Sequence, residues 1–295
     1  MLAGATASGK SSLAVELALR VNGEIVNGDA FQLYAGVPIT TAQPTGEVLK
    51  VVPHHLYGVL PVHEACDAAK YRDVAMRVVN EIRGRGRMPI VVGGSGLYLK
   101  ALTHGLAPLP PVDAALRQKI AVLTPEERVR HLLELDPDAE VNVPLPNDRY
   151  VSRALEVCLL TGQAQSKLRR QWQDMPAQCA GAVLVRPREE LWRRIEQRTD
   201  GMLASGLVDE VRALPADVAN VAKAIGVRQA LDFMAGKLTR SELREAIVIA
   251  TRQYAKRQGT WFRREKELVE LEAGEGETDA GLASKLLEVC PGLVK

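Results

Sequence analysis

Eight residues near the start of the chain have the types and the spacing of a polyphosphate-binding loop. They fit the pattern G-x-x-x-x-G-K-[ST] and are Gly4, Ala5, Thr6, Ala7, Ser8, Gly9, Lys10 and Ser11. The glycines let the backbone turn its N–H groups toward one anion, Lys10 adds a positive charge, and the Ser11 hydroxyl can bind Mg²⁺. Leu13, Leu17 and Val21 recur every four residues and predict a helix whose positive end faces that anion. We therefore expect a diphosphate or triphosphate site.

An acidic residue follows the next predicted strand. Residues 23–28 are expected to form a short strand that leads into Asp29, with an amide and two aromatic rings directly after it. Ligands of open α/β sheets bind at the C-terminal ends of the strands, which favours a functional role for Asp29. On position alone, a simple turn role for Asp29 is an equally good interpretation.

A third strand is predicted at residues 88–92, and it carries no acidic residue. It leads into Gly93-Gly94-Ser95-Gly96 and a further helix, which again gives an N-terminus suited to anions. P-loop enzymes that hydrolyse ATP or GTP usually have an acidic residue in this part of the site for Mg²⁺ and water. Its absence argues against a motor protein or a switch GTPase.

One arginine is expected on the buried face of a helix that spans residues 189–205. Leu191, Ile195 and Met202 mark that face, and the helical period places Arg198 among them. A buried guanidinium is costly unless it meets an anion, so a phosphate in the site is the sharper interpretation. A structural salt bridge to Asp or Glu is the alternative.

Basic residues gather in three other places along the chain. Arg149 and Arg153 share one face of a predicted helix, Lys223 and Arg228 flank a short segment, and residues 252–264 mix five Lys or Arg with three aromatic residues. Cations that contact phosphates, interleaved with stacking rings, suit a nucleic-acid surface. A solvated helix face, or cations that complement the dipole of their own helix, would give the same pattern.

The order of these elements predicts an α/β fold, a P-loop parallel sheet flanked by helices, with an all-helical insertion. Strands and helices alternate up to a proline-rich hinge at 108–111, helices alone follow over 112–179, and a strand returns at 182–185. We expect residues 1–111 and 180–295 to form the catalytic core. Only three residues precede Gly4, so the first strand is very short or begins before residue 1. The acidic segment after residue 267 is expected to be loose and to have no catalytic part.

Composition indicates a globular protein of the reducing cytoplasm. The 295 residues are 46% hydrophobic and 25% charged with a net charge of +2, so a nucleic-acid surface has to come from local clustering. The four cysteines have no metal-ligand spacing, and no apolar run is long enough for a membrane span. His54 and His55 are adjacent and point to opposite sides of an extended segment, so we expect structural roles rather than chelation.

The motifs, in this order, resemble those of one family, the tRNA dimethylallyltransferases, also called tRNA isopentenyltransferases. The resemblance covers about residues 1–264 and rests on Gly4–Ser11, Asp29–Tyr34, Pro53–His55, Gly93–Tyr98, Asn147–Val157 and Arg252–Arg263. It implies transfer of a dimethylallyl group from dimethylallyl diphosphate to N6 of adenosine 37, just 3′ of the tRNA anticodon. Under this interpretation the P-loop holds a leaving diphosphate, which accounts for the missing acidic residue.

The resemblance also implies roles for individual residues. Asp29 accepts the proton of the adenine amine, Thr6 hydrogen-bonds the base, and Arg198 joins residues 4–11 in binding diphosphate, with Mg²⁺ on Ser11. The insertion would bind the anticodon stem, and the target base would have to flip out of its stack. The residues implied to contact tRNA are Asp29, Ala30, Phe31, Gln32, Ser95, Arg117, Arg149, Tyr150, Val151, Ser152, Arg153, Lys223, Ala224, Ile225, Gly226, Val227 and Arg228. We expect a monomer with no membrane partner.

Three other functions compete with this interpretation. An adenylate isopentenyltransferase, which prenylates free AMP, ADP or ATP, shares the core motifs but has no need of the insertion or of the basic segment 252–264. A small-molecule P-loop kinase needs an acidic partner for Mg²⁺ and leaves the ordered motifs unexplained. A pure RNA-binding protein leaves Lys10 and Arg198 without a purpose.

Overall fold

A computed structural model describes residues 1–107, 109–173, 179–274 and 276–290. The chain forms two compact units, Met1–Thr103 with Cys179–Lys295, and His104–Gln178. The sequence placed these boundaries at residues 111 and 179. Pro108 of the predicted hinge and residues 174–178 of the predicted insertion lie outside the described residues. Within the described part of the chain, no helix is both long and apolar enough to cross a membrane.

The larger unit is built on a six-stranded sheet in which every described pairing is parallel, as predicted. Its strand order is β3-β2-β4-β1-β5-β6, so the strand before the P-loop lies inside the sheet. That strand, β1, has only three residues, and all three are buried. The strands are β1 Leu2–Gly4, β2 Gly23–Asn27, β3 His54–His55, β4 Met88–Gly93, β5 Ala182–Val185 and β6 Val269–Glu272.

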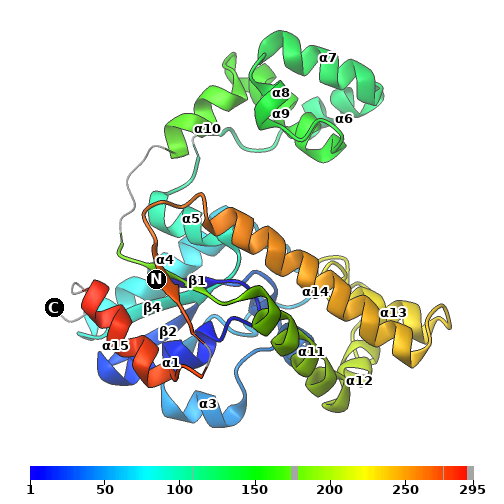
Figure 1. Cartoon of the computed structure of the whole chain (residues 1–295). Helices are drawn as coiled ribbons and strands as arrows, with labels where there is room; N and C mark the ends of the chain where they lie inside the picture. The colour runs from blue at the N-terminus through cyan, green and yellow to red at the C-terminus, as the bar shows by residue number, and fades with distance from the viewer. Residues whose placement is uncertain (108, 174–178, 275, 291–295) are drawn as a thin grey trace. The chain divides into compact units, whose positions relative to one another are not determined.

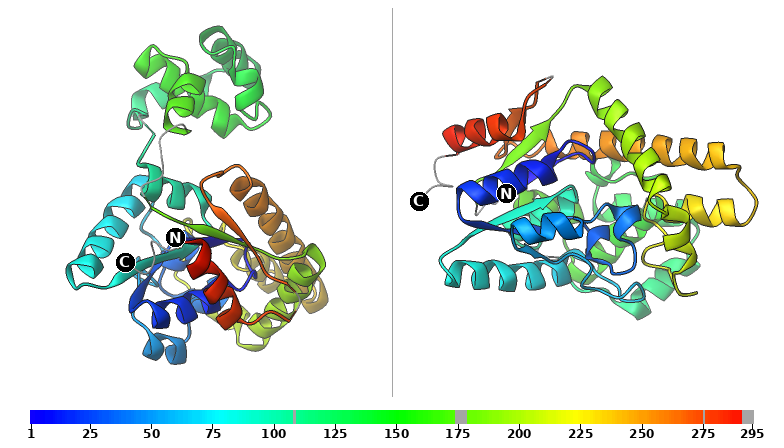
Figure 2. Two further views of the ribbon diagram at one scale, coloured as in Figure 1. Left: turned by 60° about the vertical axis from the view of Figure 1, so that its left-hand side comes forward. Right: turned by 90° about the horizontal axis from the view of Figure 1, so that it is seen from below.

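Neighbouring residues on each strand point into two different cores, which lie on opposite faces of the sheet. Leu2 and Ile25 pack with α1 (Lys10–Arg20) and α15 (Asp279–Val289), whereas Ala3 and Val26 pack with the other layer. That second layer contains α4 (Ala68–Gly84), α5 (Gly96–His104) and the end of α14 (Arg240–Phe262). Figures 1 and 2 show α1 and α15 side by side against the sheet. The sheet is therefore covered on both faces, as a parallel sheet requires.

Most of the remaining helices of this unit surround a third core next to the C-terminal ends of the strands. Leu207, Val227 and Ile247 are almost fully buried in it. The Glu210 carboxylate caps the N-terminus of the short helix α2, where it accepts hydrogen bonds from Ile39 N at 2.6 Å and Thr40 N at 2.8 Å. The elements here are η1 Phe31–Leu33, α2 Pro38–Thr41, α11 Arg188–Ala204, α12 Leu207–Arg212 and α13 Val227–Met234. Helix α3, Gly46–Val51, contributes no residue to this core. Helices α11 and α14 lie side by side (Figure 1).

The smaller unit is all-helical over its described residues, as predicted. Its helices are α6 Ala114–Val122, α7 Pro125–Leu135, α8 Ala139–Asn142, α9 Asp148–Thr161 and α10 Gln165–Gln173. Ile120, Leu132 and Leu155 form its core. Thr124 and Glu127 form a capping box at the start of α7, and Gly162 ends α9 with a φ of 64°, a conformation that suits glycine.

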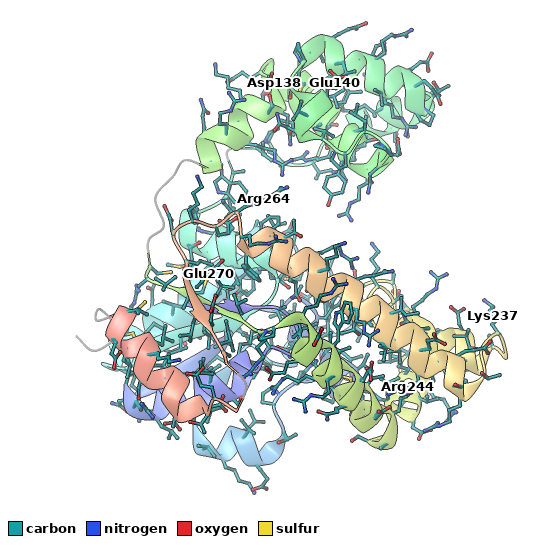
Figure 3. The ribbon with its side chains drawn as sticks, viewed as in Figure 1. Asp138, Glu140, Lys237, Arg244, Arg264 and Glu270 are labelled. Carbon is teal, nitrogen blue, oxygen red and sulfur yellow. The ribbon has the colours of Figure 1, made fainter. Side chains whose placement is uncertain are left out.

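The described residues of the C-terminal segment form a strand and a helix, so the expectation of a loose acidic tail is wrong. Strand β6 pairs with β5, and α15 packs against α1. Leu271, Leu282 and Leu286 are buried, whereas Glu270 and Glu272 are exposed; Figure 3 labels Glu270 on this strand. The alternation of acidic and apolar residues over 269–272 is a strand pattern at the edge of the sheet, and the high charge concealed it.

Candidate active site

The P-loop joins the end of β1 to the start of α1, and its shape depends on residues with positive φ. Gly9 has a φ of 95° and Ala7 a φ of 63°, both in the left-handed region that turns the backbone sharply. Lys10, the first residue of α1, bends back so that Nζ donates to Ala5 O at 3.3 Å. No side chain caps the N-terminus of α1, which leaves its first amides available to a bound anion.

A cavity of about 250 Å³ opens beside this loop. Its charged lining consists of four cations (Lys10, Arg198, Lys223 and Arg257) and one anion, Asp29, for a net charge of +3. The rest of the lining combines an apolar wall (Phe31, Val92, Ile195, Met202, Leu207, Ala224, Ile225 and Ile247) with Thr6, Ser11, Gln32, Thr40, Thr41, Ala42, Tyr57, Thr199, Thr251 and Tyr254. Such a lining suits a ligand that has both anionic groups and an apolar part.

Asp29 reaches this cavity because a buried asparagine fixes the chain after β2. Asn27 is fully buried; its Oδ1 accepts from Asp29 N at 2.8 Å, and its Nδ2 donates to the carbonyls of Asp29 and Leu56, each at 3.0 Å. One Asp29 carboxylate oxygen then accepts from Phe31 N at 3.3 Å. The carboxylate is therefore held at a defined position on the cavity wall.

Lys10 and Arg198 are two partly buried cations on the cavity wall. Burial lowers the pKa of Lys10 to about 8, and burial also lowers the pKa of Arg198; the charge of Asp29 partly opposes both shifts. Arg198 donates to Thr6 Oγ1 at 3.1 Å, and no ion pair within the described chain includes Arg198. Because a guanidinium can only donate, the Thr6 hydroxyl keeps its own proton for another acceptor. Desolvated cations without a counter-ion favour a bound anion.

Two further arginines, which the sequence analysis missed, hold the P-loop from behind. The Nε of Arg194 donates to Ala7 O at 2.8 Å, and the Nε of Arg186 donates to Ser8 O. Glu190 accepts from Arg186 at 2.8 Å and thereby helps to orient it. Arg186, Glu190, Arg194 and Arg198 follow one another every four residues, which is the helical signal that could have revealed the group.

The predicted residues 29–32, 95 and 223–228 all fall in the larger unit. Phe31, Gln32, Lys223, Ala224 and Ile225 line the cavity. Behind this lining, Ser95 Oγ accepts from Ala30 N at 2.9 Å. Further along, Gly226 precedes α13, Val227 is fully buried, and Arg228 is exposed with Asp232 at 3.5 Å.

The predicted residues of the smaller unit have different surroundings. Arg117 and Arg153 both donate to the fully buried carboxylate of Glu156, at 3.1 and 2.7 Å. Val151 is buried in the core, Ser152 is partly buried, and Arg149 and Tyr150 are exposed. Of the five residues 149–153, Arg149 and Tyr150 therefore reach solvent most freely.

The basic segment 252–264 is partly interior. Phe262 is buried, and Trp261 packs against the same core, so these rings anchor α14 rather than stack on bases. Arg252 pairs with Glu196, whereas Arg263 and Arg264 are exposed at the end of the helix, where Figure 3 labels Arg264.

The described residues contain no group of three or more His, Cys, Asp and Glu side chains that could hold a metal ion. His55 instead contacts the buried Glu24 carboxylate at 2.6 Å, in line with a structural role. Ser11 lines the cavity on the first turn of α1, near Asp29. Mg²⁺ commonly takes a few protein oxygens together with substrate phosphates and water. The site therefore fits a Mg²⁺ ion shared with a bound diphosphate, and does not fit a metal centre made of protein side chains alone.

A parallel sheet whose inner strand leads into this loop, with desolvated cations at the loop, defines a P-loop phosphate-binding protein. A family model described as IPP transferase matches residues 32–265, and the chain belongs to this family. The tRNA dimethylallyltransferase of Akkermansia muciniphila is 40% identical over 287 residues, which cover 97% of both chains. That of Geobacter metallireducens is 42% identical over 281 residues, 91% of this chain and 90% of the relative.

Solved structures give the same result for the fold. The tRNA isopentenylpyrophosphate transferase of Bacillus halodurans is similar with a TM-score of 0.73 and 32% identity, covering 99% of this chain and 95% of that one. A eukaryotic dimethylallyltransferase acting on tRNA is similar with a TM-score of 0.84 and 25% identity, covering 99% and 78%. The family and the fold expected from the sequence are both confirmed.

Proposed function

We propose that this protein transfers the dimethylallyl group of dimethylallyl diphosphate to N6 of adenosine 37 in tRNA. The observation that carries the proposal is one cavity that combines a carboxylate, Asp29, with two desolvated cations, Lys10 and Arg198, beside a phosphate loop. Two relatives that match nearly the whole chain are named for dimethylallyl transfer to tRNA, which supports the proposal.

The reaction replaces a carbon–oxygen bond with a carbon–nitrogen bond. As N6 of the adenine attacks the first prenyl carbon, the bond to the diphosphate oxygen breaks and its electron pair leaves with diphosphate. Lys10, Arg198 and the amides at the start of α1 stabilise the charge that develops on this leaving group. The Asp29 carboxylate accepts the proton that N6 loses, and the Thr6 hydroxyl, which keeps its own proton, donates to the bound base.

Ser11 would hold a Mg²⁺ ion, which would supply positive charge that neutralises part of the charge on the leaving group. Residues 4–11 and Arg198 bind the diphosphate, and the apolar wall formed by residues such as Ile195, Ile225 and Ile247 shields the prenyl carbon from water. This shielding matters because water would otherwise compete with the amine for the same carbon.

The tRNA is the larger substrate, and its recognition involves both units. Asp29, Phe31, Gln32 and residues 223–225 line the cavity, Ala30 and Ser95 lie behind it, and together they receive the flipped adenosine and its neighbours. Residues 226–228 continue the segment that begins at Lys223. The helical unit binds the anticodon stem through Arg149 and other basic residues. The enzyme acts as a monomer in the cytoplasm.

A direct assay tests the proposal. Labelled dimethylallyl diphosphate is incubated with the protein and either unmodified tRNA that carries adenosine 37, the same tRNA with guanosine at that position, or AMP. We expect label in the first tRNA alone. Label that enters AMP but not tRNA would identify an adenylate isopentenyltransferase, and label in the guanosine-37 tRNA would contradict the assigned acceptor.

A further inference from the structure

One buried side chain connects the P-loop to the glycine turn that follows β4. Gln258 on α14 is only 4% exposed. Its Oε1 accepts from Thr6 N at 2.8 Å, and its Nε2 donates to Gly94 O at 2.9 Å. The two hydrogen bonds fix the amide in one orientation. If the amide were flipped, its NH₂ group would face the Thr6 N–H and its oxygen would face the Gly94 carbonyl, and neither pair can form a hydrogen bond.

The helix that carries Gln258 approaches this turn too closely for side chains to intervene. A Cβ added to Gly94 would lie 2.1 Å from Gln258 Nε2, and a Cβ added to Gly96 would lie 2.3 Å from Trp261 Nε1. Gln258 and Trp261 are three residues apart on α14 and therefore share a face of the helix. The two glycines of the turn thus allow α14 to be seated against the P-loop.

The bridge connects the two halves of the proposed active site. On one side, the Thr6 N–H is occupied by Gln258, so the backbone of Thr6 is fixed and its hydroxyl is held where Arg198 donates to it. On the other side, Gly94 precedes Ser95, whose hydroxyl accepts from Ala30 N, the amide next to Asp29.

We propose that Gln258 is a positioning residue for prenyl transfer, a role that rests on the proposed function. By tying Thr6 to Gly94, it sets the distance between the residues that bind the leaving diphosphate and the carboxylate that accepts the amine proton. It touches neither substrate. An error of about 1 Å in such an alignment can cost about 100-fold in rate, so the effect falls on kcat more than on binding.

Three variants test this role. Gln258→Leu removes both hydrogen bonds. Gln258→Glu keeps an acceptor for Thr6 N but has no donor for Gly94 while it is ionised. Glu245→Leu is the control at an exposed position of the same helix. We expect Gln258→Leu to lower kcat by about 30- to 100-fold, with KM for tRNA and for dimethylallyl diphosphate within about threefold of wild type. Glu245→Leu should match wild type.

The glutamate variant gives a readout that a merely structural residue would not. When it is protonated, the carboxyl group can donate to Gly94 O and accept from Thr6 N, as the amide does. The ratio of its kcat to that of wild type should therefore rise severalfold between pH 8 and pH 6, measured at a temperature where both proteins remain folded.

The outcomes separate the inference from the proposed function. If wild type transfers no label, the function itself fails. If wild type is active and Gln258→Leu has a kcat within threefold of Glu245→Leu, the positioning role is overturned. Should Gln258→Leu fail to fold, the glutamate variant decides, because a kcat ratio that does not change with pH would also overturn the role.

Discussion

Replacing Lys10 with methionine should make the ligand-free protein more stable and at the same time abolish its function. Burial lowers the pKa of Lys10 to about 8 from an ordinary value of 10.5. A fall of this size means that the fold disfavours the charged amine by about 3 kcal/mol. Methionine has a similar length and no charge, so Lys10→Met should remove most of this cost.

The expected size can be measured by thermal unfolding at pH 7 without ligand. About 3 kcal/mol corresponds to a rise in Tm of about 5–10 °C for a unit of this size. Lys50→Met is the matched control, because Lys50 lies on the surface of α3 with its side chain 73% exposed, and it should leave Tm unchanged. An unchanged or lowered Tm in Lys10→Met would refute the reasoning.

The sign of the pH dependence gives a second check on Lys10. Below pH 8 the lysine is charged in both the folded and the unfolded state, so its full cost is present. Between pH 8 and 10.5 the folded protein loses this proton first, and the cost disappears as pH rises. The Tm advantage of Lys10→Met should therefore be full at pH 7, shrink as pH rises above 8, and vanish above pH 10.5. A bound prenyl diphosphate analogue should stabilise wild type far more than the variant, because the anion favours the charged amine.

Three further predictions concern other carboxylates and arginines of the two units. Asp29→Asn should lower kcat by about 10²- to 10⁴-fold while tRNA affinity stays within a few fold, measured by single-turnover transfer and filter binding; near-normal transfer would remove Asp29 as the base. Burial raises the pKa of Glu24, but its hydrogen bonds with Arg85 and His55 outweigh this and hold the pKa below its ordinary value. The ionised Glu24 carboxylate therefore contributes stability that is present above the unfolded pKa and lost as pH falls through the folded pKa. Glu24→Gln should lower the free energy of unfolding in urea by about 1–3 kcal/mol at pH 7 and by little near pH 3. An equal cost at both pH values would contradict this. In the helical unit, Arg149 is exposed, and Arg149→Ala should lower tRNA affinity and flatten the salt dependence of binding. Arg153→Ala should mainly lower thermal stability, because it leaves the buried Glu156 carboxylate with one partner fewer. The reverse pattern would exclude this division of roles.

The local parts of the fold could be predicted because their signals lie within a few residues. The P-loop pattern, the strands that became β2, β4 and β5, and the capping boxes at Thr124 and Thr239 all appear in the structure. Strand β3 has only two residues, and β6 alternates acidic with apolar residues, so neither carried a clear strand signal. The contacts that orient the site are of another kind. Gln258 bonds to Thr6 and Gly94, which are 252 and 164 positions away, and no local pattern records such a pairing.

The glycines at the ends of β2 and β4 explain why this P-loop site has no acidic residue on β4. A Cβ on Gly93 would lie 2.1 Å from Gly28 O, so the backbone at the end of β4 is in contact with the backbone after β2. This contact brings Asp29 close to the phosphate loop. The next residue, Gly94, faces α14, and the Gln258 amide fills the space that a Cβ of residue 94 would need. A neutral amide with both hydrogen-bonding sides satisfied cannot activate water. In P-loop enzymes that hydrolyse nucleotides, the end of this strand commonly carries the acidic residue. Here the end of β4 instead helps to align Thr6 with Asp29. This arrangement suits attack by an amine on carbon rather than attack by water on phosphorus.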